Sequence, residues 1–194
     1  MDRTEAIQLI AEHMRSRLTP DQAVEAIRAF FSDFIPGDLR PQLDPSLVAQ
    51  HDRHDVPPTI LPFDPRYQPV LLHQMKRRLR GATNVYLSAY LYGNLNRSVA
   101  VSGQMTELLA CPVCDYKSLP IRGNWDVCPV CGWKSDPVQE AVPDEPVGAN
   151  SVSLNQARAN FAAIGLSAEG VRDRVDAHGR YKYPRAERAA RPPA

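Results

Sequence analysis

Apolar side chains recur at helical spacing through much of the first hundred residues. Between residues 3 and 17 they stand at Ile7, Ile10, Ala11 and Met14, with charged residues between them. Positions three or four residues apart share one face of a helix. This pattern therefore predicts an amphipathic helix at the start of the chain.

A second helix is predicted to begin after Thr19. The residues Thr19-Pro20-Asp21-Gln22 form a capping box with proline at the first helical position, and Pro36-Gly37 ends the apolar pattern. A further apolar stripe over residues 66–80 predicts another helix, which Gly81 stops. Together these segments predict a helical domain over residues 1–104.

Residues 84–95 fit two patterns. Tyr86 and Tyr90 are spaced as on one face of a helix, whereas Val85, Leu87 and Ala89 alternate as in a strand. Periodicity alone does not separate the two. We expect a buried helix here, because apolar residues face several sides, followed by a strand or linker over residues 97–105.

All four cysteines of the chain lie between residues 111 and 131. They form two Cys-Pro-Val-Cys pairs with thirteen residues between them. Each pair can bind a metal ion from one tight turn, called a knuckle, and two knuckles supply the four sulfurs of a structural Zn²⁺ site. Such a set leaves no open position for water or substrate. We therefore predict structural zinc at Cys111, Cys114, Cys128 and Cys131.

The cysteine pairs have two other interpretations. One Cys-Pro-x-Cys pair also resembles a dithiol redox motif, and two pairs could form disulfides. However, the chain has a net charge of +1, lacks an apolar run long enough to cross a membrane, and begins without a signal-peptide pattern. We therefore expect a cytoplasmic protein, whose thiols stay reduced.

A zinc module is predicted over residues 105–178. Residues 116–127 have the length for two short strands joined by a turn near Gly123, which is zinc-ribbon geometry. Tyr116, Trp125 and Trp133 are expected to cover the sulfurs. A module this small needs the metal for much of its stability.

The remainder of the chain is predicted to be mixed. We expect an acidic loop over residues 136–148, a helix capped by Ser153 and ended by Gly165, and a last helix over residues 168–177. Residues 179–194 are expected to be a flexible tail. The predicted fold class is α+β, with a mainly helical N-terminal half, a small four-cysteine zinc ribbon and C-terminal helices.

Two charged clusters invite other chemistry. The run His51-Asp52-Arg53-His54-Asp55 could share a metal ion, with His51 and His54 on one helical face, or could be a solvated loop. Lys76, Arg77, Arg78 and Arg80 end a predicted helix, where cations suit the helix dipole but could also bind phosphate. We prefer the loop and the dipole interpretations.

Three stretches of the second half carry a resemblance. They read CPVCDYKSL at 111–119, CPVCGWKSDPVQ at 128–139 and GANSVSLNQARANF at 148–161. Through them, residues of about 108–165 resemble the bacterial cysteine-rich CPCC family. Val113 stands where that family has a further cysteine, so the resemblance implies a zinc set of the four cysteines present. It also implies a helix packed on the module and no particular enzymatic activity.

Four polar residues of the third stretch surround the expected helix start. These residues are Asn150, Asn155, Arg158 and Asn160. We expect them to brace the helix against the ribbon, with partner binding as the alternative. A catalytic role is not expected, because no carboxylate pair, Ser–His or Cys–His arrangement accompanies them.

Three classes of function follow. We expect a non-enzymatic zinc-binding protein that binds a partner protein, most specifically an immunity protein against a bacterial polymorphic toxin, because such small proteins often accompany these toxins. Acidic residues could then mimic nucleic acid: Asp33, Asp38, Asp136, Glu140, Asp144 and Glu145. The alternative is a transcription-associated ribbon that binds nucleic acid through Arg77, Arg78, Arg122 and Lys134, which the near-neutral charge disfavours. An enzyme using His51 and His54 is the third class.

Overall fold

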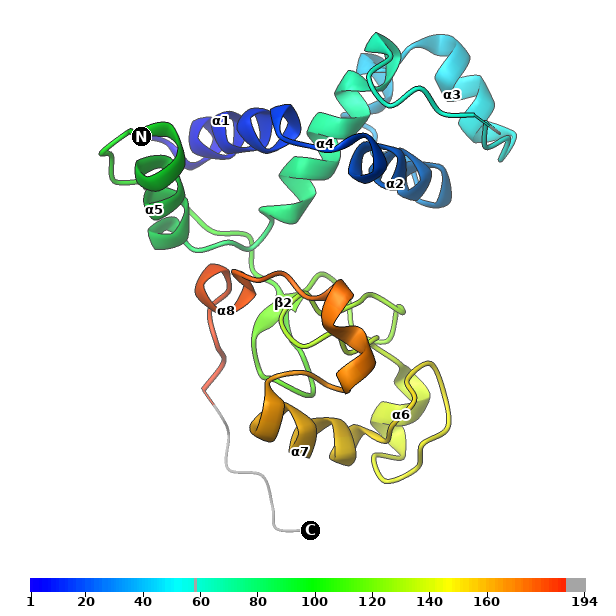
Figure 1. Cartoon of the computed structure of the whole chain (residues 1–194), viewed down its shortest axis with the longest axis vertical. Helices are drawn as coiled ribbons and strands as arrows, with labels where there is room; N and C mark the ends of the chain where they lie inside the picture. Colours follow the sequence, from blue (N-terminus) through cyan, green and yellow to red (C-terminus); the bar gives the residue numbers. More distant parts are fainter. Residues whose placement is uncertain (58, 188–194) are drawn as a thin grey trace. The chain divides into compact units, whose positions relative to one another are not determined.

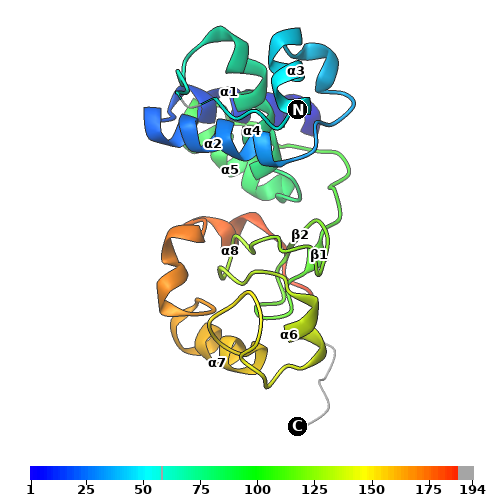
Figure 2. The same cartoon turned by 90° about the vertical axis from the view of Figure 1, so that its right-hand side faces the viewer.

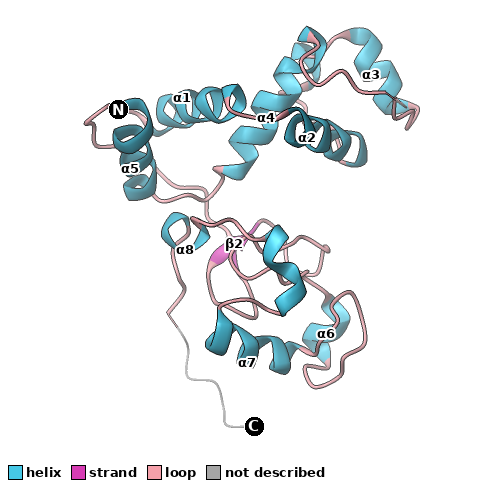
Figure 3. Cartoon of the chain, in the orientation of Figure 1, coloured by secondary structure: helices cyan, strands magenta, loops and turns pink. Residues whose placement is uncertain are grey.

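The computed structural model describes residues 1–57 and 59–187 and divides into two compact units (Figure 1). The first unit holds residues 1–80 and 87–103. The second holds residues 81–86 and the chain from Gln104 onward. Helices dominate the first unit, whereas the second combines short helices, a two-stranded sheet and long loops (Figure 3). The predicted α+β class is therefore confirmed.

The first unit is built from short helices with well-formed N-termini. Asp2 caps the first helix with its carboxylate, and Thr19 and Gln22 form the predicted capping box of the second. The helices are α1 (Arg3–Ser16), α2 (Pro20–Ser32), α3 (Pro45–Asp52) and α4 (Gln68–Arg78), with 3₁₀ turns at Arg40–Gln42 and Pro65–Tyr67. The helix predicted over residues 66–80 is thus a 3₁₀ turn followed by α4.

The core of the first unit forms where helix α4 meets its neighbours. Helix α4 contacts both α1 and α2 (Figure 1). Its residues Val70 and Leu71 are buried together with Ile27 and Phe31 of α2 and Leu47 of α3. These are the apolar positions at helical spacing, so the pattern in the sequence is also the pattern of the core.

Helix α5 spans Asn84–Leu95, the range that the sequence predicts. It begins in residues of the second unit and continues in the first. The expectation of a fully buried helix is wrong, however. Leu87 and Leu91 are buried, whereas Val85 is 80% exposed and Tyr92 is largely exposed. Its apolar residues face several sides, but only one side is covered.

The sheet of the second unit pairs β1 (Leu109–Ala110) with β2 (Lys117–Leu119) in antiparallel fashion (Figure 2). Both strands were expected within residues 116–127; β2 lies there, whereas β1 lies before Cys111, so the prediction is confirmed for one strand and wrong for the other. The first knuckle is itself the turn of this hairpin. It reverses the chain between the strands, and β1 therefore precedes Cys111. Residues 97–105 form no strand beyond one bridge between Asp2 and Ser102.

Short helices complete the second unit. They are α6 (Pro137–Ala141), α7 (Leu154–Ile164), a 3₁₀ helix (Glu169–Arg174) and α8 (Gly179–Lys182). Helix α7 begins after Ser153 and ends at Gly165, which has φ +77°, as predicted. The helix expected over residues 168–177 is only the 3₁₀ segment, and the loop expected after Asp136 contains α6.

The predicted flexible tail needs correction. Residues 179–187 are packed against the second unit: Gly179, Lys182 and Tyr183 are buried, and Arg185 bridges to Tyr116. The remaining residues of that predicted tail, 188–194, lie outside the described part of the chain. Within the described ranges, no helix combines the length and apolar character needed to cross a bilayer.

Candidate metal centre

The first knuckle is a tight turn closed by backbone hydrogen bonds. The Cys111 amide donates to the Tyr116 carbonyl at 2.9 Å, and the Asp115 amide donates to the Cys111 carbonyl at 3.0 Å. Asp115 has φ +65°, a left-handed conformation that aspartate tolerates better than most residues. The turn brings Cys111 and Cys114 to the same side of the chain.

The second knuckle repeats the first. The Cys128 amide donates to the Trp133 carbonyl at 2.8 Å, and the Gly132 amide donates to the Cys128 carbonyl at 2.8 Å. Gly132 has φ +77°, and a Cβ there would lie 2.4 Å from a methyl of Val171. Glycine is therefore required at position 132 for two reasons: the left-handed backbone conformation and the close approach of Val171.

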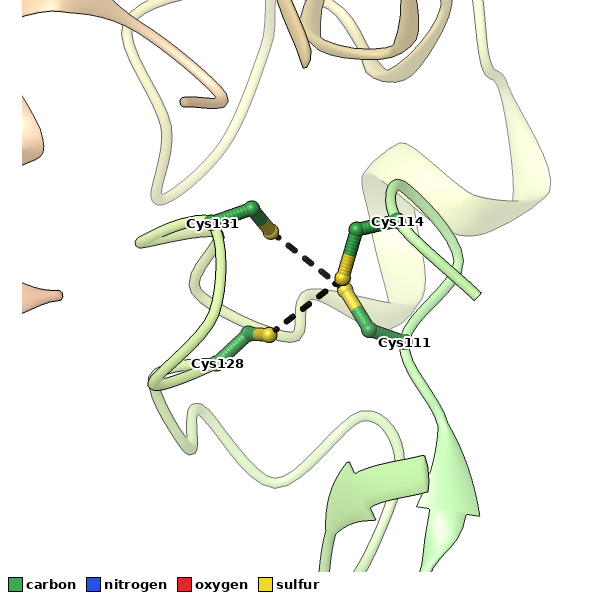
Figure 4. Close-up of side chains that lie close together, drawn as sticks. All are labelled: Cys111, Cys114, Cys128 and Cys131. Carbon is green, nitrogen blue, oxygen red and sulfur yellow. Dashed lines mark hydrogen bonds between the residues drawn. The ribbon is translucent and has the colours of Figure 1, made fainter. Parts of the chain in front are cut away.

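The four sulfurs form one cluster (Figure 4). The Cys111 and Cys131 sulfurs are 3.6 Å apart, as are those of Cys114 and Cys128, and all four lie within 4.8 Å of one another. A tetrahedron with Zn–S bonds of about 2.3 Å has edges of about 3.8 Å. The spacing of the predicted ligands thus fits one tetrahedral ion.

Burial makes the cluster unfavourable as four bare thiolates. All four cysteines are buried, and desolvation raises the pKa of the Cys111 thiol well above its ordinary value. The Cys128 sulfur lies 3.2 Å from the Ser118 hydroxyl and accepts from the Val130 amide at 3.4 Å. These two groups favour a thiolate at Cys128. A divalent cation is the group that would stabilise thiolates at all four cysteines together.

Residues 109–180 match the family described as Cysteine-rich CPCC. The predicted resemblance is confirmed, and the match extends beyond the expected residues of about 108–165. We refer to residues 109–180 as the CPCC module. No curated protein matches the chain. Among residues 1–57 and 59–187, the four cysteines are the one group of His, Cys, Asp or Glu side chains close enough to share an ion.

Helix α7 is braced against the CPCC module by polar residues of the third family stretch. Arg158 donates from Nε to the Pro112 carbonyl at 3.0 Å and from Nη1 to the Asn155 side chain at 2.6 Å. Asn160 donates to the Ser167 carbonyl at 2.9 Å, and the Ser167 amide donates to the Cys131 carbonyl at 2.7 Å. These contacts support the bracing interpretation, because they link α7 to both knuckles.

Asn150 joins the segment after the second knuckle to α6. Its side chain accepts from the Lys134 amide at 2.9 Å and donates to the Lys134 carbonyl at 2.8 Å. It also donates to the Gln139 side chain, which is fully buried. The Asn150 side chain therefore pairs with the Lys134 backbone as a neighbouring strand would. This role also fits the bracing interpretation.

The apolar cover of the sulfurs differs partly from the prediction. Trp133 is fully buried in the cysteine cluster, and Tyr116 packs at its edge, as expected. Trp125, however, is 49% exposed and does not belong to the cluster. Tyr183 of the expected tail is buried there instead. The aromatic ring of Tyr183 was the only sequence signal for its burial, because the residues around it show no apolar pattern typical of a buried segment.

Asp136 is buried, although it was expected in an acidic surface loop. Its carboxylate accepts from the Val138 amide at 2.8 Å and from the Ala149 amide at 2.7 Å. One oxygen thus caps α6, and the other holds the loop that returns from it. The cap was not predicted, although Asp followed by Pro is typical of a helix start, and the second bond joins residues thirteen positions apart.

Replacing Asp136 with alanine should destabilise the second unit by about 2–4 kcal/mol, because a buried carboxylate is lost and the two backbone amides that it joins lose their acceptor. Both tryptophans of the chain, Trp125 and Trp133, lie in that unit, so tryptophan fluorescence during urea unfolding reports on it specifically. Glu145→Ala, at an exposed neighbouring position, should change stability by less than about 0.5 kcal/mol. Equal effects would contradict a structural role for Asp136.

The two histidines of the proposed alternative site do not share a face. His51, at the end of α3, is buried, and its Nε2 is 2.7 Å from the Asp33 carbonyl oxygen. His54 follows the helix in a left-handed conformation, φ +54°, and is exposed. His51 is therefore a core residue that packs on Phe30 and Phe31.

The candidate phosphate-binding cations have partners within the chain. Arg77 forms an ion pair with Asp33, and Arg122 donates twice to the Glu140 carboxylate. The Lys134 ammonium lies 5.9 Å from the centroid of the Trp125 ring. Three of the four residues expected to bind nucleic acid thus have a partner within their own unit.

Proposed function

We propose that the CPCC module holds one structural Zn²⁺ ion on Cys111, Cys114, Cys128 and Cys131. The observation that carries this proposal is a closed, buried set of four sulfurs at tetrahedral spacing. Sulfur donors in this geometry favour zinc over harder cations such as Mg²⁺ or Ca²⁺. Four protein ligands fill the coordination sphere, so the ion would stabilise the fold and would not bind a substrate.

Metal analysis tests this directly. The purified full chain should contain about one zinc per chain, and replacement by Co²⁺ should produce the visible absorption of tetrahedral thiolate coordination. The Cys128→Ser variant should lose both signals. Iron in place of zinc, or a chain that refolds fully without any metal, would contradict the proposal.

We further propose that the protein is non-enzymatic and acts by binding another protein. The loop over residues 120–127, between the knuckles, exposes Ile121 and Trp125. It is nevertheless held rigidly, because Gly123 donates to the Ser135 hydroxyl at 2.7 Å and the Trp125 amide donates to the Ser135 carbonyl at 2.9 Å. Large aromatic side chains on rigid elements are the residues that most often anchor protein interfaces.

The backbone at Trp125 strengthens this proposal. Its φ of +63° is a conformation that bulky residues rarely adopt. Strain of this kind costs about 1–3 kcal/mol and is retained mainly where it serves a function. Since Trp125 does not contribute to the buried cluster, presenting its indole to a partner is a use that would justify the strain.

The partner that we propose is a bacterial polymorphic toxin, which would make this protein its immunity partner. What supports this is the family resemblance together with the exposed Ile121 and Trp125 on a loop that is hydrogen-bonded to Ser135. Mimicry of nucleic acid receives less support than the sequence suggested. Asp136 is buried and Glu140 is paired with Arg122, so Asp144 and Glu145 are the exposed acids among the four proposed in the second unit, and Asp144 accepts from the Asn155 side chain.

An affinity purification from the native host tests the partner-binding proposal, with Trp125→Ala as the discriminating variant. We expect one stoichiometric protein with the native chain and at least about a tenfold loss of affinity on removing the indole, since anchors of this kind contribute about 2 kcal/mol or more. Tyr92→Ala, which removes an exposed aromatic ring from α5, should bind normally. Salt-sensitive retention of nucleic acid in place of a protein would favour the alternative function.

A further inference from the structure

The C-terminal segment of residues 176–186, which we call the latch, crosses both knuckles of the metal centre. At the second knuckle the Asp176 amide donates to the Pro129 carbonyl at 2.8 Å. Gly179 lies so close to the same carbonyl that a Cβ would be 2.9 Å from it. The latch thus begins in tight backbone contact with the chain between Cys128 and Cys131.

At the first knuckle the latch adds to the edge of β2. The Lys117 amide donates to the Pro184 carbonyl at 2.8 Å, and the Ala186 amide donates to the Asp115 carbonyl at 2.8 Å. The Arg185 guanidinium also lies over the ring of Tyr116, 5.6 Å from its centroid. The segment therefore lies beside the hairpin and is joined to it by one antiparallel bridge between Tyr116 and Arg185.

Between these ends the latch buries two side chains. Tyr183 is 7% exposed and packs in the cluster that contains the four cysteines. Lys182 is 3% exposed, with its ammonium paired to Asp176 and 5.4 Å from the centroid of the Tyr86 ring. The Thr83 amide donates to the Lys182 carbonyl at 2.8 Å. The ion pair joins two residues of the latch itself and neutralises the buried ammonium, whereas Tyr183 and the hydrogen bond from Thr83 join the latch to the rest of the unit.

Most of these contacts are additions to the CPCC module. The family match ends at residue 180, so Lys182, Tyr183 and Arg185 lie beyond it, and Thr83 and Tyr86 lie before it. Trp133 and α7, the other covers of the sulfurs, belong to the module and cannot leave without unfolding it. The regular structure of the latch is limited to the four-residue helix α8 and one bridge, and segments with little regular structure open locally at a lower free-energy cost than the core.

We propose that the latch controls how fast the metal is exchanged. With the latch closed, Tyr183 keeps an incoming ligand away from the sulfurs. The metal is released only after the latch opens, while the knuckles and α7 stay folded. This is a ligand exchange without a redox step. The inference rests on the zinc site proposed above and adds a regulatory element to it.

The test is the rate of zinc transfer from the loaded full chain to excess 4-(2-pyridylazo)resorcinol, which absorbs visible light when it binds zinc. If opening limits release, the rate should reach a plateau as the chelator concentration rises. Tyr183→Ala should release zinc about tenfold faster, the change that corresponds to about 1.4 kcal/mol of opening free energy. Tyr181→Ala, at a neighbouring position that is 79% exposed, should release it at the native rate.

A second variant guards against misfolding. Asp176→Asn leaves the buried Lys182 ammonium without its opposite charge, which favours opening of the latch because the ammonium then reaches water. The variant removes no buried apolar surface, so it should also accelerate release while one zinc per chain is retained. Native rates in both Tyr183→Ala and Asp176→Asn would overturn the latch proposal and leave the zinc site intact. A native chain that binds no zinc would instead overturn the proposed site, and the latch proposal with it.

Discussion

Replacing Cys128 with serine is expected to unfold the second unit while the first stays folded. The buried cluster loses one of four sulfurs, and the remaining thiols have no cation to offset their desolvation. Structural zinc in small modules contributes about 10–16 kcal/mol of apparent binding energy, which is also folding energy. No cysteine belongs to the core of the first unit, so its helices should survive.

Hydrogen exchange with mass spectrometry separates the two outcomes, because it reports on each segment. Amides of α7 should lose their protection in Cys128→Ser, whereas those of α2 and α4 should keep it. Ser118→Ala serves as the control. It removes the hydroxyl 3.2 Å from the Cys128 sulfur but leaves all four ligands, so it should retain the metal. Protection in α7 that is unchanged in Cys128→Ser would contradict the metal-dependent fold.

The features that the sequence predicted correctly are encoded locally. Thr19 and Gln22 are three positions apart and cap each other, and Ser153 caps α7 by accepting from the Gln156 amide. The two knuckles depend on four residues and a left-handed turn, so their spacing was sufficient to indicate a common site. In each case the residues that decide the structure lie within one turn of the chain.

The wrong predictions concern contacts between distant residues. Asp136 and Tyr183 look like surface residues in their local sequence, because the amide of Ala149 and the cysteine cluster that bury them are remote. The pairing expected within residues 116–127 was wrong for a related reason, although β2 does lie there. The partner of β2 is the segment before the first knuckle, and no local pattern shows which of two flanking segments pairs.

The two tryptophans make the sharpest contrast between a core and a surface role. Trp133 is fully buried among the cysteines and Leu154, whereas Trp125 is 49% exposed. Trp133→Ala should therefore destabilise the second unit by about 3–5 kcal/mol through lost burial and the cavity that remains. Trp125→Ala should destabilise the second unit by less than about 1 kcal/mol. It should not relieve the strain of the left-handed backbone, because alanine also disfavours a positive φ.

Each variant leaves one tryptophan as the reporter of its own unfolding. In Trp133→Ala the remaining emission should be that of a half-exposed indole, and its urea midpoint should fall sharply. Trp133→Phe adds a finer test, because within the described residues the Trp133 Nε1 group is buried without a hydrogen-bond partner. Phenylalanine keeps an aromatic ring and removes that unpaired donor, so it should recover much of the stability that alanine loses. If Trp133→Ala and Trp125→Ala shifted the midpoint equally, the assignment of one indole to the metal core and the other to a binding surface would be wrong.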